Sequence, residues 1–171
     1  MRNIFIISFI ANLILTIVVL IMGPETMAIH FGGGGEPNGW ASVRANALIM
    51  IGMDALLFVI FFSVPFLMSV TPDRWINLPN KDYWLRDENR PRAMSMLRDE
   101  MYKLGTLMFV FMFVVGLLVL QANLSDPVRL REGLFWPPFV LFMAYTVYWT
   151  VGIYRIFRVP KEGASDDGVR R

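Results

Sequence analysis

Asp54 is the residue with the clearest chemical potential in this 171-residue sequence, because it is the one acidic side chain well inside a long hydrophobic block. On membrane-insertion scales an aspartate near the centre of a helix costs about 2.5–3.5 kcal/mol, so its carboxylate must face protein or water. Asn12 and Tyr145 lie at similar depths in two other hydrophobic blocks, if the helices cross the bilayer straight. We therefore predict that Asp54 hydrogen-bonds Asn12, Tyr145 or both. This cluster is either a structural clasp or a site for a proton, a cation or a ligand.

Little else in the sequence is suited to catalysis or to metal binding. The chain has no cysteine, which excludes disulfides, iron–sulfur clusters and thiolate zinc sites, and its single histidine excludes a haem held by two histidines of one chain. His30 with Glu25 and Glu36 is an alternative metal site, but a lone histidine in a glycine-rich loop is a weak ligand set. We expect no catalytic residue, no metal and no cofactor, and hence no enzyme.

Four hydrophobic blocks organise the chain, at residues 4–22, 45–70, 104–122 and 134–154. Each is long enough to cross a bilayer as a helix, because about 20 residues at ~1.5 Å per residue span a hydrocarbon core of ~30 Å. The composition agrees, since 56% of the residues are hydrophobic and 18% are charged, against about a quarter charged in soluble domains. The sequence therefore predicts an all-α integral membrane protein with four transmembrane helices. These helices form one domain over residues 1–157, and a disordered polar tail follows over residues 158–171.

The basic residues outside these blocks predict the orientation in the membrane. Of the 16 lysines and arginines, thirteen fall on the side of the two termini and the loop 71–103, and three fall on the other side. Because the cytoplasmic side carries the excess of basic residues, we expect both termini and the loop 71–103 to be cytoplasmic. The first block could instead be a signal peptide cleaved after Ala28. Its length of about 19 apolar residues exceeds the usual 7–15, so we expect it to be retained as an anchor.

The loop 71–103 combines aromatic residues with a helical pattern. Trp75, Tyr83 and Trp84 are expected at the depth of the lipid headgroups. After Pro91, apolar residues recur every three or four positions while basic residues occupy other faces, which predicts a cytoplasmic amphipathic helix between the second and third spans. The apolar positions are Met94, Leu97, Met101 and Leu104, and the basic ones are Arg92, Arg98 and Lys103. This helix either orients and anchors the chain or uses Arg92, Arg98 and Lys103 to dock a cytoplasmic partner.

The loop between the first two spans contains four successive glycines, at residues 32–35. Pro37-Asn38-Gly39 is a strong signal for a tight turn, and Ala28 to Phe31 is a candidate extended stretch before it. Glycine-rich loops also bind phosphates, but this one lacks the Lys-Ser/Thr ending of a P-loop. The loop is therefore interpreted as a connector, with Trp40 as an interfacial anchor.

The residue pattern of this loop resembles that of a known family of bacterial membrane proteins, the domain of unknown function 1648. The matching positions are His30, Phe31, Gly35, Pro37, Gly39 and Trp40, and the segment Asn77 to Leu85 is also similar to one in its members. The resemblance covers roughly residues 1–125, and the run of four glycines departs from the pattern. The domain is similar to the amino-terminal part of SdpI-type immunity and signalling proteins, which are longer than this chain.

Together these observations favour an integral-membrane accessory or signalling protein that acts through protein contacts. Its partner is either another membrane or cytoplasmic protein or a second copy of the chain. The alternative is a small oligomeric transporter, or an ion- or proton-handling protein, that uses Asp54 in the middle of the membrane. A net charge of +2 does not indicate a nucleic-acid partner, because the basic residues follow the membrane topology. We expect the protein to reside in the inner membrane of a bacterium.

Overall fold

The computed structural model describes residues 1–160 and is mostly helical. Its elements, in chain order, are α1 (Arg2–Met22), β1 (Thr26–Phe31), β2 (Pro37–Ser42), α2 (Val43–Val70), the 3-10 turn η1 (Asp73–Trp75), α3 (Lys81–Trp84), α4 (Arg90–Asn123) and α5 (Glu132–Ile156). Four of the helices, α1, α2, α4 and α5, are long and apolar enough to cross a membrane. The prediction of a multi-pass membrane protein is thereby confirmed as far as the length and the composition of these four helices go. Most of the predicted disordered tail, from residue 161 onward, lies outside the described residues.

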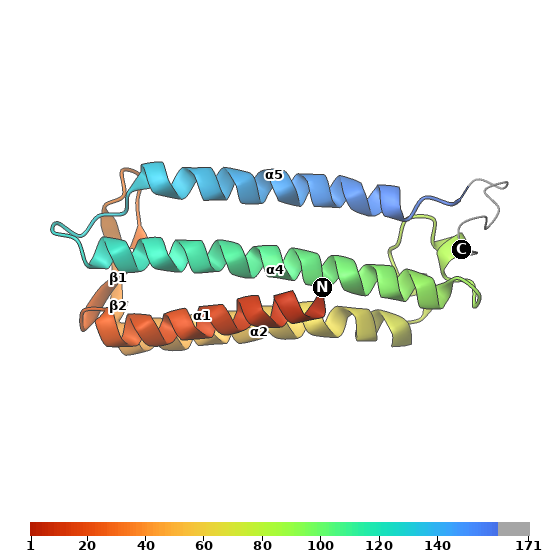
Figure 1. Ribbon diagram of the computed structural model, residues 1–171, viewed down its shortest axis with the longest axis horizontal. Coiled ribbons are helices and arrows are strands. Elements are labelled where there is room, and N and C mark those ends of the chain that lie inside the picture. The colour runs from red at the N-terminus through yellow and green to blue at the C-terminus, as the bar shows by residue number, and fades with distance from the viewer. Residues whose placement is uncertain (161–171) are drawn as a thin grey trace, which may run out of the picture.

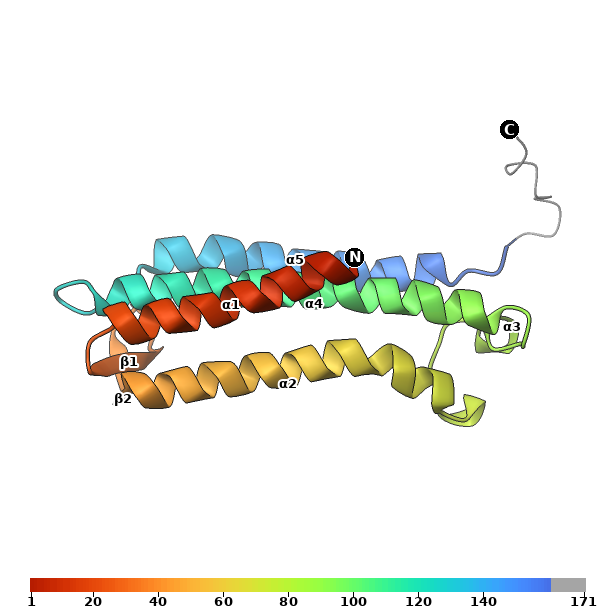
Figure 2. The same cartoon turned by 60° about the horizontal axis from the view of Figure 1, so that its bottom comes forward.

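α4 is the central helix of the bundle. Figures 1 and 2 show α1 and α2 on one side of α4 and α5 on the other. In agreement, α1, α2 and α4 pack against one another, whereas α5 packs mainly against α4. The protein core therefore lies among α1, α2 and α4, and no residue of α5 is buried.

Aromatic rings fill the part of this three-helix core nearest the amino terminus. The Phe5 ring is fully buried, and its centroid lies 5.2 Å from that of Phe58 and 5.3 Å from that of Tyr102, in stacked arrangements. Gly105 makes this approach possible, because a Cβ there would lie 2.6 Å from the Phe5 ring. The absence of a side chain at this position lets α1 and α4 come close together.

The chain is not all-α as predicted, because β1 and β2 form an antiparallel hairpin between α1 and α2. The reversal occurs in the glycine-rich segment, where Gly34 and Gly35 have positive φ angles of 91° and 76°. The predicted turn at Pro37-Asn38-Gly39 is wrong, since these residues belong to β2. The partner strand has irregular register between Ala28 and Phe31, opposite these residues. Pro37-Asn38-Gly39 thus distorts the pairing of the two strands instead of reversing the chain.

Contacts from the far half of the chain hold this hairpin in place. The Asn123 side chain, at the end of α4, accepts a hydrogen bond from the Ala28 N–H at 2.7 Å and donates one to the Ala28 carbonyl at 2.9 Å. The tip of the hairpin is bound by the segment before α5, where the Leu130 N–H donates to the Gly35 carbonyl at 2.8 Å and Arg129 Nε donates to the Gly34 carbonyl at 2.9 Å. The hairpin is therefore a fixed cap on this end of the bundle.

The segment predicted to be an amphipathic helix is helical and runs into the third span, as expected, while its place at the cytoplasmic membrane surface stays a prediction. Residues 90–103 are the first part of α4, which runs on without interruption for 34 residues, or about 50 Å. This length exceeds a ~30 Å hydrocarbon core, so one end of α4 projects beyond it. The apolar positions face protein, since Leu97 is buried and Met94 and Met101 pack against the same cluster.

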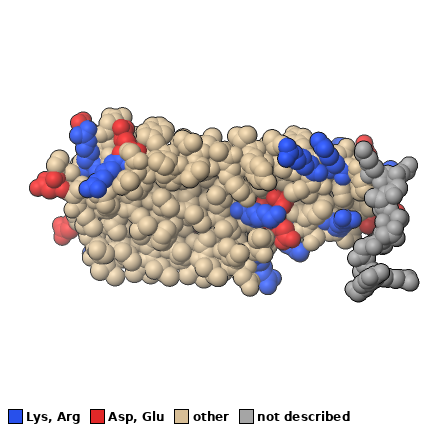
Figure 3. All heavy atoms as spheres, turned by 45° about the horizontal axis from the view of Figure 1, so that its top comes forward, with Lys and Arg blue, Asp and Glu red and all other residues tan. Residues whose placement is uncertain are grey.

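A small hydrophobic lobe surrounds this projecting end of α4. Its buried residues are Ile76, Leu78, Trp84, Leu85, Ala93, Leu97 and Phe157. Trp84 is only 3% exposed and packs inside the lobe, whereas Trp75 is 72% exposed, and the headgroup depth of both stays a prediction. Figure 3 shows charged residues gathered towards the two ends of the visible face, with a broad uncharged stretch between them.

The fixed hairpin tip yields a prediction about two neighbouring glycines. We expect Gly35→Ala to lower the melting temperature of the purified protein, whereas Gly33→Ala leaves it unchanged or slightly raised. A left-handed backbone costs a residue other than glycine about 1–2 kcal/mol, and a Cβ at position 35 would also overlap the Leu130 carbonyl oxygen. At position 33 no atom lies within 4 Å of the added Cβ. Tryptophan fluorescence during heating measures both, and equal melting temperatures for the two variants would contradict the docked tip.

Candidate functional site

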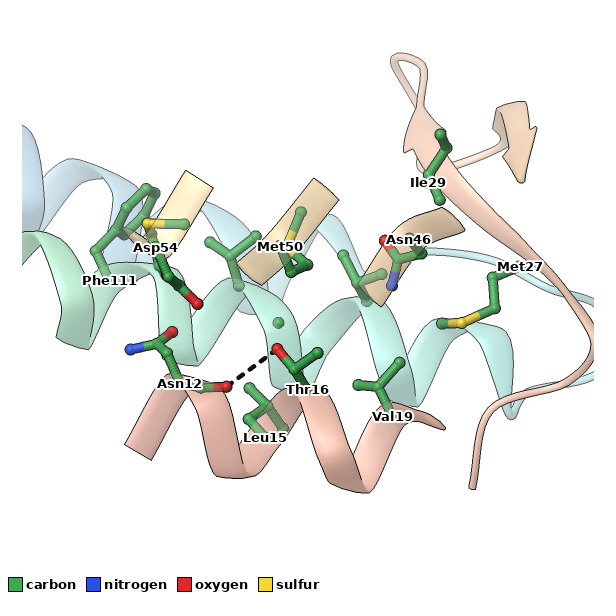
Figure 4. A pocket seen from close by; sticks show the side chains of 14 residues that line it. Asn12, Leu15, Thr16, Val19, Met27, Ile29, Asn46, Met50, Asp54 and Phe111 are labelled. Carbon is green, nitrogen blue, oxygen red and sulfur yellow. Dashed lines mark hydrogen bonds between the residues drawn. The ribbon is translucent and has the colours of Figure 1, made fainter. Parts of the chain in front are cut away.

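A cavity of about 220 Å³ lies between α1, α2 and α4, beneath the hairpin. Figure 4 shows the side chains that line it, with α1 on one side, α2 on the other, α4 behind and Ile29 of β1 at the hairpin end. The lining residues are Asn12, Leu15, Thr16, Val19, Met27, Ile29, Asn46, Met50, Asp54, Phe111, Met112, Val115, Gly116 and Val119. Asp54, predicted as the residue with most chemical potential, is one of them.

Helical spacing brings these residues together. On α2, Asn46, Met50 and Asp54 are four residues apart, so they form one stripe along the helix. On α1, Asn12 and Thr16 are likewise four residues apart. α4 contributes mostly aliphatic side chains and Phe111, so two polar stripes face each other across an apolar rear wall.

The four polar side chains of the cavity, Asn12, Thr16, Asn46 and Asp54, are all buried. Asn12 Nδ2 donates to the Ser8 carbonyl and to the Phe109 carbonyl, each at 2.9 Å, so it joins α1 to α4. Thr16 Oγ1 donates to the Asn12 carbonyl at 3.1 Å, the bond drawn in Figure 4. The polar hydrogens of these two α1 residues are therefore largely used within the protein.

Neither Asn46 nor Asp54 makes a side-chain hydrogen bond within residues 1–160, and Asp54 is the most deeply buried of the four. It is only 2% exposed, and its Oδ1 atom has no hydrogen-bond partner among the described residues. Figure 4 shows its carboxylate pointing from α2 into the cavity, towards α1. Buried polar atoms are nearly always paired, and an unpaired buried carboxylate is costlier than an unpaired amide, so the Asp54 oxygen calls for a ligand or a functional role.

The predicted hydrogen bonds from Asp54 to Asn12 and Tyr145 are wrong. Asn12 lines the same cavity, but its amide donates to backbone carbonyls instead. Tyr145 belongs to α5 and lines a different, apolar groove between α4 and α5. Phe111 borders both spaces and stacks on Phe142 of α5 with ring centroids 4.5 Å apart. α4 thus separates Tyr145 from Asp54, although the two residues are at similar depths.

The residues of the predicted outer-loop motif lie in and around the hairpin. The His30 ring nitrogen Nδ1 is hydrogen-bonded to Asn38 Oδ1 across the two strands. Gly39 is paired with His30 across the two strands, and a Cβ on Gly39 would be 3.0 Å from His30 Cβ. Gly35 is buried at the docked tip, Phe31 and Pro37 form the last strand pair, and Trp40 is half exposed. The motif therefore describes how the hairpin is built.

The alternative metal site on His30 is not assembled. Within residues 1–160, no group of three or more His, Cys, Asp or Glu side chains is arranged to hold a metal ion. His30 pairs with Asn38, and neither Glu25 nor Glu36 makes a side-chain hydrogen bond to it.

The three basic residues predicted to dock a partner do not form one patch. Arg92 and Arg98 are exposed, but at 100° per residue they project about 120° apart around α4. Lys103 lies nearly above Arg92 and forms an ion pair with the buried Glu100. Arg92 and Arg98 are thus available for contacts, whereas Lys103 neutralises a buried carboxylate.

Sequence reasoning missed Thr16 and Asn46 in the cavity and Asn123 at the hairpin. The first two carry a readable signal, because Asn12 and Thr16, and likewise Asn46 and Asp54, are separated by whole multiples of four residues within apolar helices. Asn123 carries none, since its partner Ala28 lies 95 residues away in the sequence.

Comparison with protein families adds one match. Residues 7–53 match the family model of a domain of unknown function, DUF1648. The resemblance predicted from the hairpin residues is thereby confirmed for this part of the chain. The DUF1648 segment comprises most of α1, the hairpin and the first part of α2, and it ends one residue before Asp54. The similarity at Asn77 to Leu85 lies outside the match and stays a prediction.

No curated protein and no solved structure matches the chain. The DUF1648 segment therefore supplies two walls and the cap of the cavity without supplying an activity.

The unpaired carboxylate yields a prediction about stability. We expect Asp54→Leu to raise the free energy of unfolding by about 1 kcal/mol or more, because it removes an unsatisfied buried polar group. We expect Asn12→Leu, of similar shape, to lower the free energy of unfolding, because it removes two interior hydrogen bonds. Thermal unfolding in one detergent compares both with the wild type. A fall in stability for Asp54→Leu would instead identify Asp54 as part of a structural clasp.

Proposed function

We propose that this chain is an integral-membrane accessory or signalling protein that acts through contacts with another protein and carries out no catalysis. The observation that carries the proposal is the ordered lobe at the projecting end of α4, with exposed arginines on its surface. The DUF1648 match and the multi-pass architecture are compatible with it. The similarity to SdpI-type signalling proteins, predicted from the sequence, points the same way by family analogy.

Polar contacts between distant segments support a defined shape for this lobe. Trp84 Nε1 and Asn80 Nδ2 both donate to the Phe157 carbonyl, at 2.9 Å and 2.7 Å, and so join α3 to the end of α5. Arg90 forms an ion pair with Asp73, which joins η1 to the start of α4. A surface held in this way can present fixed side chains to a partner without first paying a large ordering entropy.

Arg92 and Arg98 are the side chains best placed to contact that partner. Both are exposed on the first turns of α4, and because they project about 120° apart, the partner has to reach two faces of the helix. An acidic partner surface suits two exposed guanidinium groups, which bind carboxylates in a bidentate fashion.

The proposal places this lobe and both termini in the cytoplasm, with the hairpin outside the inner membrane of a bacterium. The sequence supports this orientation, because thirteen of the 16 lysines and arginines belong to the two terminal segments and the loop 71–103.

Single cysteines test the orientation cleanly, because the chain has none of its own. Glu36 in the hairpin loop and Asp87 in the lobe are both exposed. In intact cells we expect a membrane-impermeant maleimide to label Glu36→Cys and to spare Asp87→Cys, with both labelled after permeabilisation. The reverse pattern in intact cells would overturn the orientation.

Affinity purification tests the contact function. We expect the carboxyl-terminally tagged chain, solubilised in mild detergent, to retain a stoichiometric protein partner. The double variant Arg92→Glu/Arg98→Glu should reduce recovery of that partner at least about tenfold, since each buried charge contact is worth about 2 kcal/mol or more. Arg74→Glu is the matched control, because Arg74 is an exposed arginine of the same lobe outside the docking set. Equal recovery with all variants would count against this surface.

The cavity favours a second candidate function, in which an oligomer of the chain handles an ion or a proton through Asp54. Its support is the unpaired Asp54 carboxylate buried in the bundle. Four helices are few for a carrier, so this function needs more than one copy. Flux across liposomes that is lost in Asp54→Asn would favour it, whereas a partner complex with no flux favours the contact function.

A further inference from the structure

The cavity described above contains one ionisable group and no counter-charge. Asp54 is the only lining residue with a titratable side chain, and neither ion pair found among residues 1–160 involves it. A carboxylate in such surroundings gains more from a cation than one in water does, because the effective dielectric is lower.

The other polar atoms in the cavity offer mainly lone pairs. Asn12 Nδ2 is occupied by two carbonyls, which leaves its Oδ1 as an acceptor. The Thr16 hydroxyl donates to the Asn12 carbonyl, so its oxygen is free to accept as well. The Asn46 amide adds one more acceptor oxygen and the cavity's one unused N–H₂ donor. Acceptors and one negative group therefore outnumber the donors, which suits a ligand that brings N–H donors and a positive charge.

The remaining surface is apolar and roomy. Ten of the fourteen lining residues are aliphatic, thioether, aromatic or glycine. About 220 Å³ is far more than a bare metal ion occupies, and an apolar protein cavity of ~150 Å³ can hold benzene. Met27, Met50 and Met112 can adapt to an apolar ligand, and the face of Phe111 can attract a cation.

We propose that this cavity binds a small organic ammonium ion with an apolar body, whose ammonium group pairs with Asp54. The inference rests on the Asp54 site of the second candidate function and names its ligand class, but it does not require transport. Ca²⁺ and Mg²⁺ are poor fits because each needs six or more oxygen ligands, and Zn²⁺ is a poor fit because the lining contains no His or Cys. An anion is a poor fit because the lining contains no Lys, Arg or His.

The polar stripe on α2 gives the ligand a route from the hairpin end. Asn46 is in the first turn of α2, and Asp54 lies eight residues further, or about 12 Å along the axis. Met27 and Ile29 of β1 border the cavity at that end, and Ile29 is half exposed. A charged head group that enters beside Ile29 meets Asn46 first and Asp54 last.

Binding of 4-fluorobenzylammonium to the purified full chain in lipid nanodiscs tests the inference, with fluorine NMR as the readout. Protein-free nanodiscs measure partition into lipid, and 4-fluorobenzyl alcohol is the neutral probe of similar shape. We expect saturable binding of the ammonium probe that Asp54→Asn weakens about 10- to 100-fold, the range for a hydrogen bond to a charged group. Asp99→Asn, which removes an exposed carboxylate outside the cavity, is the control and should bind as the wild type does.

A second variant covers the case in which Asp54→Asn fails to fold. Val115→Phe keeps the carboxylate and fills the cavity from α4, so we expect it to abolish saturable binding of the same probe. The inference is overturned if the ammonium probe shows no saturable binding to the wild type, or if either cavity variant binds it as tightly as the wild type does.

The outcomes also separate this inference from the functions proposed above. Probe binding without flux supports the ligand site and overturns transport. Asp54-dependent proton flux without probe binding supports the second candidate function and overturns the ligand site. Recovery of a protein partner depends on Arg92 and Arg98, which lie outside the cavity.

Discussion

The packing of α1, α2 and α5 around one uninterrupted helix, α4, is the constraint on which the rest of the structure depends. α4 forms the rear wall of the cavity, carries the Asn123 side chain that holds the hairpin, and supplies the buried face of the lobe at its other end. Because a single continuous helix contacts both the hairpin and the lobe, it fixes their positions relative to each other across about 50 Å. Gly105 and Gly116 matter for the same reason, since side chains there would meet Phe5 and Leu15 of α1.

Inside this frame the cavity is a local departure from good packing. Four polar side chains are buried in it, and one of them, Asp54, has an oxygen with no partner among the described residues. Such departures cost stability and persist where activity needs them, so they identify functional positions better than well-satisfied residues do. The satisfied polar residues of the fold, Asn123 and Trp84, each join segments that are far apart in the sequence.

The number and extent of the membrane helices could be predicted from the sequence, because bilayer thickness and hydrophobic block length determine them. The position of a residue along its helix could be predicted in the same way, and Asn12 and Asp54, predicted to lie at similar positions, do line one cavity. Which helix faces which is a tertiary property, and depth alone wrongly joined Tyr145 to Asp54. The extended stretch from Ala28 to Phe31 was predicted and is part of β1, but the turn was placed at Pro37 to Gly39, which belong to β2. The contacts of Asn123 and Leu130 with the hairpin come from the other half of the chain and leave no local signal.

The attachment of α5 has a consequence for its contact with the lipid around the protein. Its first residue, Glu132, accepts a hydrogen bond from the Gly34 N–H, and the Phe157 carbonyl just beyond its end accepts two from the lobe. Between these two fixed ends no residue is buried, and an apolar groove separates α5 from α4 around Tyr145. In a bilayer, acyl chains complete the packing that the protein leaves open there. α5 is thus held by hydrogen bonds at both ends and by ring stacking on α4 in its middle, as with Phe142 on Phe111, and lipid fills only the groove beside these contacts.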